Sequence, residues 1–330
     1  MSKSIVEWSK EYKHLVDKEI LKFIPNIPYP PNLYAPIWYH LKSGGKRLRS
    51  TCAILIYKSL GGDIKKIMPF AAACEILHHW LLIHDDIEDE DVMRREKPTV
   101  WAKYGLNTGI NVGDFLSEKV YEIVLSLREK NVSDKVVMNI LELTIDTALK
   151  TGLGQALDMY FKNTIPTESE YLKMIKLKTG AYLALPMLGA AIIAGTDKET
   201  IQLIKQYGEY IGPAYQIIDD ILDYNEMSKN FGSDIKEGKR TLIMIHCISK
   251  CKKNERLQLI KILNKKREKT TKSDIKYVIT LLEKYKSIDY SFNKAKLLVE
   301  KGKRAIDEVK NIATKTYLNE IADFIINRNF

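Results

Sequence analysis

Apolar residues recur at intervals of three and four positions along most of the chain, which is the spacing of a buried stripe on an α-helix. This pattern predicts long helices over residues 46–60, 64–88, 106–129, 133–162, 167–195, 197–225 and 271–311. Some helix starts carry capping signals, such as Thr167 followed three residues later by Glu170. Alternating strand patterns are scarce. The sequence therefore predicts an all-α fold, a helical bundle around one core.

Prolines and lysines mark the few irregular segments. Five of the ten prolines fall between Pro25 and Pro36, which predicts an extended loop between two helices. The Lys-rich stretch 250–273 is the one candidate linker, and it fits a connection between short surface helices better. No change in composition marks a boundary, so we expect a single domain over residues 1–330.

Composition narrows the class of protein. The chain has 330 residues, of which 45% are hydrophobic, and a net charge of +10. Such values exclude a disordered or collagen-like chain. Four cysteines are too few for a disulfide scaffold and suggest a reduced, cytoplasmic setting. The polar start 1–13 lacks the apolar segment of a signal peptide, and we expect no transmembrane helix. The positive charge favours anionic partners.

One acidic motif, DDxxD, occurs twice. The first copy holds Asp85, Asp86 and Asp89, and the second holds Asp219, Asp220 and Asp223. On a helix, residues four apart share a face, so each motif can present two carboxylates to a hard divalent cation such as Mg²⁺. The second motif interrupts a run that otherwise reads as buried core, where unpaired carboxylates are expensive. The pair therefore indicates a metal site with room for a diphosphate.

Basic residues accompany both acidic motifs. Gly44 and Gly45 precede a helix start with Lys46, Arg47 and Arg49, where backbone amides and side chains favour an anion. Further candidates are Arg94, Arg95, Lys178, Lys229, Lys236, Lys239 and Arg240. Acidic metal sites interleaved with such cations predict a metal-bridged polyphosphate substrate. Nucleic-acid binding is not expected, because it would pair the basic residues with aromatic ones and would not use an acidic bowl.

With these motifs the chain resembles the trans-isoprenyl diphosphate synthases, and most of all the archaeal short-chain geranylgeranyl diphosphate synthases. The resemblance covers nearly the whole length. It is carried by GGKRLR at 44–49, HDDIEDEDVMRR at 84–95, KPTVWAKYG at 97–105, INVGDFL at 110–116, GQALDM at 154–159, KTG at 178–180, YQIIDDILD at 215–223 and GSDIKEGKRT at 232–241. Two positions depart from the family pattern, Glu96 and Ser228, where the family often has Gly.

The resemblance implies an isoprenoid-synthase-type bundle around a central cavity, with two diphosphate pockets. Two or three Mg²⁺ ions would join an allylic diphosphate to Asp85, Asp89 and Asp219, with Asp86, Asp220 and Asp223 in support. The allylic diphosphate would also contact Arg94, Lys178, Thr179, Gln216, Lys229 and Lys239. Isopentenyl diphosphate, without metal, would bind Lys46, Arg49, His78 and Arg95. The allylic bond ionises, and isopentenyl diphosphate then attacks the cation.

Product length is expected to depend on the helix before the first motif. The growing chain would run from Asp85 towards the start of that helix, past Leu81, Trp80 and Leu77. Trp80 is the largest side chain available to plug such a tunnel. In the family, one bulky aromatic there fits a C20 product and a second would suggest C15. Because residue 81 is leucine, we favour geranylgeranyl diphosphate.

Several alternatives stay open at this point. Farnesyl diphosphate or a longer polyprenyl diphosphate could be the main product. A terpene cyclase shares the helical bowl but typically replaces the second motif and has no use for the GGKR segment. A non-catalytic regulatory subunit can lose aspartates, and none is missing here. The family also implies a homodimer, with faces such as 106–125 against the twin, and the basic surface suggests peripheral contact with anionic lipid.

Overall fold

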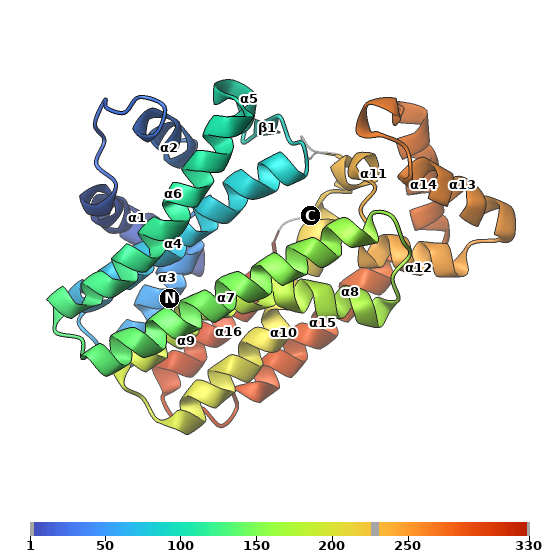
Figure 1. Cartoon of the computed structure of the whole chain (residues 1–330). Coiled ribbons are helices and arrows are strands. Elements are labelled where there is room, and N and C mark those ends of the chain that lie inside the picture. Colours follow the sequence, from blue (N-terminus) through green and yellow to red (C-terminus); the bar gives the residue numbers. More distant parts are fainter. Residues whose placement is uncertain (1–2, 226–230, 329–330) are drawn as a thin grey trace. The chain divides into compact units, whose positions relative to one another are not determined.

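The computed structural model describes residues 3–225 and 231–328, and its regular structure is almost entirely helical (Figure 1). The strands within these residues are β1 Met93–Arg94 and β2 Lys97–Pro98, which pair antiparallel as a short hairpin. The predicted all-α class is confirmed.

The chain divides into two compact units. The first consists of Met1–Ile145, Leu185–Ile201 and Val309–Glu320, and the second of Asp146–Ala184, Gln202–Glu308 and Ile321–Phe330. The division falls within four helices, α7 Asp134–Phe161, α9 Ala181–Ala194, α10 Lys198–Leu222 and α16 Ile312–Ile326. The single domain over residues 1–330 stays a prediction.

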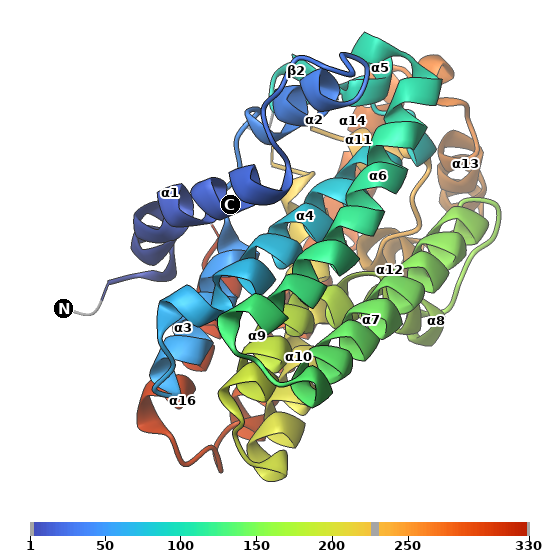
Figure 2. The same ribbon diagram turned by 60° about the vertical axis from the view of Figure 1, so that its left-hand side comes forward.

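The first unit is centred on α4. Besides α4 Ile64–Glu88, this unit contains α1 Ile5–Phe23, α2 Tyr34–Leu41, α3 Leu48–Ser59, the β1–β2 hairpin, α5 Val100–Tyr104, α6 Leu106–Leu125 and the 3₁₀ turn Ser126–Lys130. Helices α4 and α6 lie side by side in both Figure 1 and Figure 2. Gly113 makes this possible, since a β-carbon there would meet Nε2 of His84 at 2.1 Å. The close approach brings α6 against the end of α4 that carries the first acidic motif.

Helix α4 matches the predicted segment 64–88 at both ends. Asp63 caps its start by accepting a hydrogen bond from the Lys65 N–H at 3.1 Å. Its side chains are apolar nearly all round, and Phe70, Ile76 and Leu77 are almost fully buried, as expected of a helix in the middle of a core. The first motif therefore sits at the end of a firmly packed helix.

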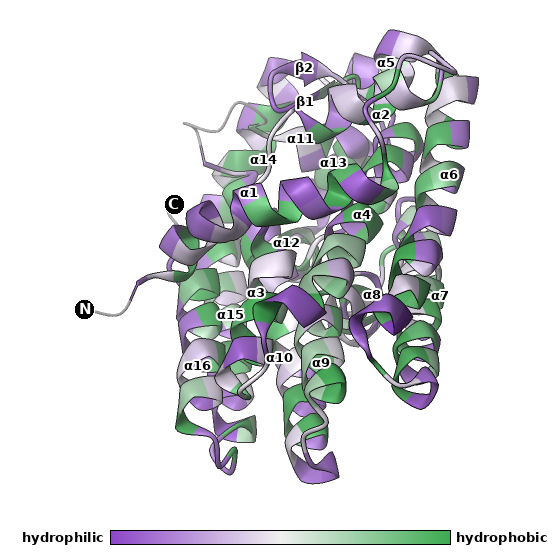
Figure 3. Cartoon of the chain, turned by 90° about the vertical axis from the view of Figure 1, so that its left-hand side faces the viewer, coloured by the Kyte–Doolittle hydropathy of each residue, from purple (hydrophilic) through white to green (hydrophobic). Residues whose placement is uncertain are grey.

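Two helical stretches are long and apolar enough to cross a membrane by length and composition, Ile64–Glu88 and Glu168–Ala194. Our sequence criterion of an uncharged apolar run missed both. Most of their apolar windows are buried within the protein, 72% and 67% respectively, which is typical of core helices. Figure 3 shows how such a core helix differs from a surface helix. Helix α9 is hydrophobic along most of its length, whereas hydrophobic and hydrophilic residues alternate along α1.

The second unit carries the second acidic motif at the end of α10. Its other elements are α8 Glu168–Ile175, a π-helical turn Lys176–Gly180, α11 Ser233–Glu237, α12 Leu242–Lys250, α13 Lys253–Leu263, the 3₁₀ turn Arg267–Lys269, α14 Lys272–Lys284 and α15 Ser287–Ala305. The predicted cap at Thr167 is present as a capping box with Glu170, which accepts from the Thr167 N–H at 2.7 Å.

Two segments differ in detail from the pattern-based prediction, and a third matches it. The segment 271–311 is two helices, because the chain turns at Lys286 with a φ of +51°. The Pro-rich stretch ends sooner than expected, since α2 begins at Tyr34 with Pro36 in its first turn, where a missing N–H is harmless. The Lys-rich stretch 250–273 contains α13, as the surface-helix interpretation predicts.

Candidate active site

The first acidic motif closes helix α4. The helix ends at Glu88, but the Asp89 N–H still donates to the Asp85 carbonyl at 2.9 Å. The backbone therefore keeps its helical path through the motif, and Asp85 and Asp89 stand one turn apart on one face, as the spacing predicts. Asp85 is half-buried and Asp89 is buried.

Asp86 points into the protein and is held by a basic partner. Its side chain is fully buried and accepts a hydrogen bond from Nε of Arg94 at 2.6 Å. Burial raises the pKa of Asp86 to about 7, although the charge of Arg94 opposes this. The second carboxylate oxygen has no hydrogen-bond partner. An orphaned buried oxygen beside two further carboxylates is the kind of group that a nearby cation stabilises.

The hairpin after the motif explains the departure at residue 96. Arg95 and Glu96 form its two-residue turn with φ values of +50° and +66°. Positive φ at both positions is the pattern of a type I′ turn, which favours glycine. The positive φ at residue 96 explains why the family often has glycine there. In this chain Glu96 adopts the same conformation, and the turn still forms.

Three of the residues expected to bind isopentenyl diphosphate come together in the first unit. The Arg95 guanidinium donates to the Gly44 carbonyl, which ties the hairpin to the GGKR loop. Burial lowers the pKa of His78 well below its ordinary value, and the charges of Arg49 and Arg95 lower it further. His78 is therefore neutral and can donate a hydrogen bond. Lys46 is exposed on the same loop, so this cluster can bind a diphosphate.

The expected chain-length residues lie on α4 within three turns before Asp85. Leu77 is buried, whereas Trp80 and Leu81 are half-buried. The indole Nε1 of Trp80 donates to Nδ1 of His84 at 3.2 Å. This hydrogen bond fixes the tryptophan ring one turn from the acidic motif, and a fixed ring can serve as a plug.

The second acidic motif has its own buried carboxylate. Asp220 accepts hydrogen bonds from the Tyr171 hydroxyl at 2.5 Å and from Nε2 of Gln216 at 2.8 Å. Burial raises the pKa of Asp220 to about 7. Thr179 donates to Gln216 at 2.6 Å, so the network joins α8, α10 and the π-helical turn. Asp220 thus corresponds in burial to Asp86 of the first motif.

The other two carboxylates of this motif have different surroundings. Asp223 lies just past α10 and accepts from the N–H of Ser233 and of Asp234 at 3.2 and 3.1 Å, so it holds the start of α11. Asp219 is 49% exposed and lies 3.2 Å from Arg328. Like Asp89, Asp223 directly follows the last residue of its helix, and the shared face of Asp219 and Asp223 stays a prediction.

The remaining basic candidates are in the second unit. Lys178 lies on the π-helical turn and pairs with Asp158 at 2.7 Å, and Lys239 pairs with Glu237 at 2.8 Å. Such π turns are frequent at functional sites. Gly154 allows this packing, since a β-carbon there would clash with the Lys178 backbone. Lys229 and Ser228 lie outside the described residues.

Sequence reasoning missed several residues that hold this site. They are Tyr171 on Asp220, Arg328 on Asp219, Asp158 on Lys178, and Trp101, whose indole donates to the carbonyls of Asp86 and Asp91 at 2.8 and 2.9 Å. Trp101 lies inside the quoted KPTVWAKYG motif, which was a usable signal. Asp158 likewise lies inside the quoted GQALDM motif, whereas Tyr171 and Arg328 pair across long stretches of sequence and no local pattern marks them.

Neither motif forms a complete metal cage by itself. Within residues 3–225 and 231–328, no group of three or more His, Cys, Asp or Glu side chains converges as around a metal ion. Mg²⁺ usually takes only one or two carboxylates and completes its shell with water and substrate phosphate. Each motif offers only a few carboxylates, one of them half-exposed. This supply fits Mg²⁺ that is bound together with a diphosphate. Asp85 and Asp219 belong to different units, and their meeting stays a prediction.

Comparison with known proteins identifies the family of this chain. The polyprenyl synthetase family model matches residues 30–282. A short chain isoprenyl diphosphate synthase of Methanocaldococcus jannaschii is 34% identical over 98% of this chain and 97% of its own length. The structure of a geranylgeranyl pyrophosphate synthetase from Pyrococcus horikoshii aligns with a TM-score of 0.89, 32% identity and 98% coverage of both chains.

A further solved structure was determined with ligands. It is a polyprenyl synthase from Caulobacter crescentus complexed with calcium and isoprenyl diphosphate, with a TM-score of 0.86, 26% identity and full coverage of both chains. The relatives cover this chain almost end to end, and the family model spans both acidic motifs and the GGKR loop. The chain belongs to the polyprenyl synthetase family.

Proposed function

We propose that this protein is a short-chain trans-prenyltransferase that condenses isopentenyl diphosphate with an allylic diphosphate to make geranylgeranyl diphosphate. The observation that carries the proposal is the matched construction of the two acidic motifs. Each buries its middle aspartate in a hydrogen bond and leaves an outer aspartate accessible, Asp85 in one and Asp219 in the other. This arrangement is expected of two carboxylate motifs that bind the same diphosphate through metal ions.

Asp85, Asp89 and Asp219 are the proposed metal ligands, for two or three Mg²⁺ ions. Mg²⁺, when bound, neutralises the diphosphate and so stabilises it as a leaving group. The family relation to a polyprenyl synthase crystallised with calcium supports a divalent metal. The buried Asp86 and Asp220 would support the metal-binding carboxylates of their motifs. Asp223 would do the same through its hydrogen bonds to the start of α11.

Side chains of the protein would then stabilise the charges that develop during the reaction. Arg94, Lys178 and Lys239 would contact the allylic diphosphate, and the amide of Gln216 and the hydroxyl of Thr179 would offer fixed dipoles near the allylic carbon. As the C–O bond breaks, apolar walls exclude water from the cation. The double bond of isopentenyl diphosphate attacks, and the departing diphosphate takes the proton. No protein base is needed.

Isopentenyl diphosphate would bind on the GGKR side. Lys46, Arg49 and Arg95 supply positive charge, and neutral His78 supplies a hydrogen bond without a further charge. The half-buried ring of Trp80 supports a C20 product, because it would stop the chain on α4 before it lengthens further.

The direct test is one assay with isopentenyl diphosphate and dimethylallyl, geranyl or farnesyl diphosphate. We expect geranylgeranyl diphosphate as the main product with Mg²⁺, and no product after EDTA treatment, because the leaving group then keeps its charge. Readdition of Mg²⁺ should restore the rate. Cyclic hydrocarbon without elongation, or elongation unaffected by EDTA, would contradict the proposal.

We further propose a homodimer that forms through α7, whose most exposed apolar side chains are more exposed than Leu106 and Ile110 on the expected face 106–125. Leu149, Leu153 and Tyr160 are between 61% and 65% exposed and follow one face of this helix. A stripe of large apolar side chains on the surface is expected to be covered by a partner. We propose that each chain forms a single domain over residues 1–330. The dimer of two such chains is the proposed active form.

Charge on this stripe should break the dimer. We expect the double variant L149E/L153E to elute at the mass of one 38.0 kDa chain, because two carboxylates cannot be buried against their own copies. Light scattering after gel filtration measures this. Leu257 on α13 is the matched control, since it is 60% exposed but lies outside the stripe. If L257E dissociates the protein equally, the interface is elsewhere.

We also propose that the enzyme works in the cytoplasm, in peripheral contact with anionic lipid. All four cysteines are free thiols, which suits a reducing compartment. The net charge of +10 favours an anionic surface, where an apolar product can be handed on.

A further inference from the structure

We propose that Asp17 of helix α1 is a positioning residue for isopentenyl diphosphate, and that it acts through Arg47 of the GGKR loop. The inference rests on the proposed function, which assigns the loop to that substrate. Asp17 precedes the segment matched by the family model, which begins at residue 30. The N-terminal helix would then support a site formed by residues that follow it.

Arg47 differs from the lysine directly before it. Lys46 is exposed, whereas the side chain of Arg47 is only 4% exposed and makes two contacts inside the first unit. Its Nε donates to Asp17 at 2.7 Å, and its Nη1 lies 3.1 Å from Nε2 of His79. Burial lowers the pKa of His79 well below its ordinary value, so this nitrogen can accept. Arg47 therefore binds protein groups on α1 and α4.

The backbone at Arg47 sets the direction of the helix that follows. Arg47 is the residue before α3 and has a φ of +49°, which non-glycine residues seldom adopt. Its carbonyl accepts from the hydroxyls of Ser50 and Thr51 at 2.9 and 2.7 Å. The loop thus enters α3 in a strained conformation that the anchored side chain must hold in place.

Gly45 leaves the space that the anchored side chain needs. Its φ is +141°, and a β-carbon there would lie 2.9 Å from Nη1 of Arg47 and 3.3 Å from Nη1 of Arg95. The glycine pair of the motif is therefore explained by how Arg47 folds back, as well as by the approach of an anion.

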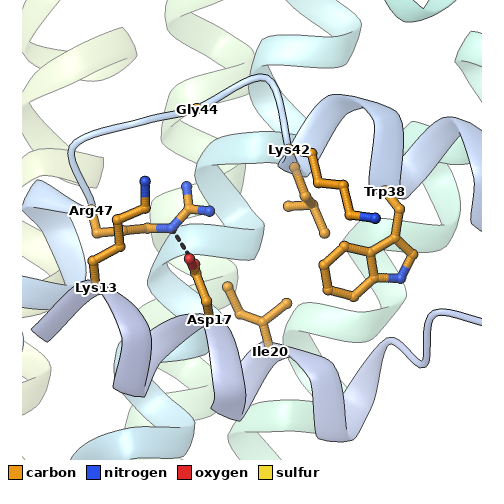
Figure 4. Close-up of a pocket in the computed structure, with 8 residues that line it drawn as sticks. Lys13, Asp17, Ile20, Trp38, Lys42, Gly44 and Arg47 are labelled. Atoms are coloured by element: carbon orange, nitrogen blue, oxygen red, sulfur yellow. Dashed lines mark hydrogen bonds and ion pairs between the residues drawn. The ribbon is translucent and has the colours of Figure 1, made fainter.

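Charge makes Asp17 the critical partner. Asp17 and Arg47 face a cavity of about 140 Å³ between α1, α2 and the loop, with Lys13 and Lys42 also on its wall (Figure 4). Among the residues that line this cavity, Asp17 is the one carboxylate beside three cations. Without it, Arg47 would share this cavity with Lys13 and Lys42 and no counter-charge on the wall, and repulsion would favour another loop conformation.

A change at Arg47 would reach the substrate cluster directly. Lys46 precedes it, Arg49 follows two residues later, and His79 is adjacent to His78 on α4. A shift of about 1 Å in such groups lowers the rate or the affinity substantially. Since the allylic site uses other residues, the effect should be confined to one substrate.

The test is a kinetic comparison of D17N with the unaltered enzyme. We expect the KM for isopentenyl diphosphate to rise about ten-fold and that for the allylic substrate to stay within about two-fold, because only the loop moves. The conservative variant D17E should recover part of the loss. Glu11 is the matched control, since it is a paired carboxylate on the same helix, and E11Q should leave both KM values unchanged.

The outcomes separate this inference from the proposed function. In the double variant D17N/R47Q the KM for isopentenyl diphosphate should equal that of R47Q alone, since Asp17 acts through Arg47. Equal rises for both substrates, additive effects, or an unchanged KM in D17N would overturn the inference. The variant K46A tests the assignment of the loop itself: if its KM for isopentenyl diphosphate is normal, the proposed binding site is wrong whatever D17N does.

Discussion

Replacing Asp219 with asparagine should lower kcat at least about a thousand-fold, equivalent to about 4 kcal/mol of transition-state stabilisation. Asp219 is the accessible carboxylate of the second motif, and the amide that replaces it is a much weaker ligand for Mg²⁺. The diphosphate would then leave with less of its charge neutralised. Single-turnover kinetics with saturating substrates and Mg²⁺ would measure the loss.

Arg328 provides the control for this variant, because D219N also removes its partner at 3.2 Å. The variant R328Q breaks the same ion pair but keeps the carboxylate. We expect R328Q to retain most of the activity and D219N to bind Mn²⁺ more weakly in the presence of diphosphate. Equal losses in both variants would mean that the ion pair matters and that metal binding does not.

Replacing Trp80 with alanine should lengthen the product by at least one isoprene unit. The ring lies one turn before the acidic motif and is fixed by its hydrogen bond to His84, so its removal opens space along α4 for further C5 additions. Chromatography of the dephosphorylated products would reveal C25 or longer chains. The rate of the first condensation should change little, because Trp80 is not among the residues proposed to bind either diphosphate.

Trp8 on α1 is a suitable comparison for that experiment. It is also a half-buried tryptophan, it stacks on Tyr12, and it has no expected part in the tunnel. The variant W8A should leave the product length at C20. If W80A gives the same product distribution as the unaltered enzyme, Trp80 is a core residue and the plug lies elsewhere.

Local patterns predicted much of the fold. The limits of α4 follow from its apolar run and from Asp63 as a cap, and the box at Thr167 follows from Glu170 three residues later. Both signals act within one turn of helix. The break at Lys286 was missed, because apolar spacing continues across it while the backbone takes a positive φ.

The site was predictable where the chemistry repeats in the sequence. The residues of the two DDxxD motifs and of the GGKR segment can be identified from the sequence. The residues that pair with them cannot. Asp17 is 30 residues from Arg47, and Tyr171 is 49 residues from Asp220. Such pairs depend on how helices pack, which apolar spacing alone leaves undetermined.

The most direct test of the account is a crystal structure with Mn²⁺ and an allylic diphosphate analogue that cannot ionise. Anomalous scattering would locate the metal ions. We predict ions that contact Asp85 and Asp89 on one side and Asp219 on the other, joined by the oxygens of a single diphosphate. Ions at only one motif, or two motifs too far apart to share a diphosphate, would contradict the account.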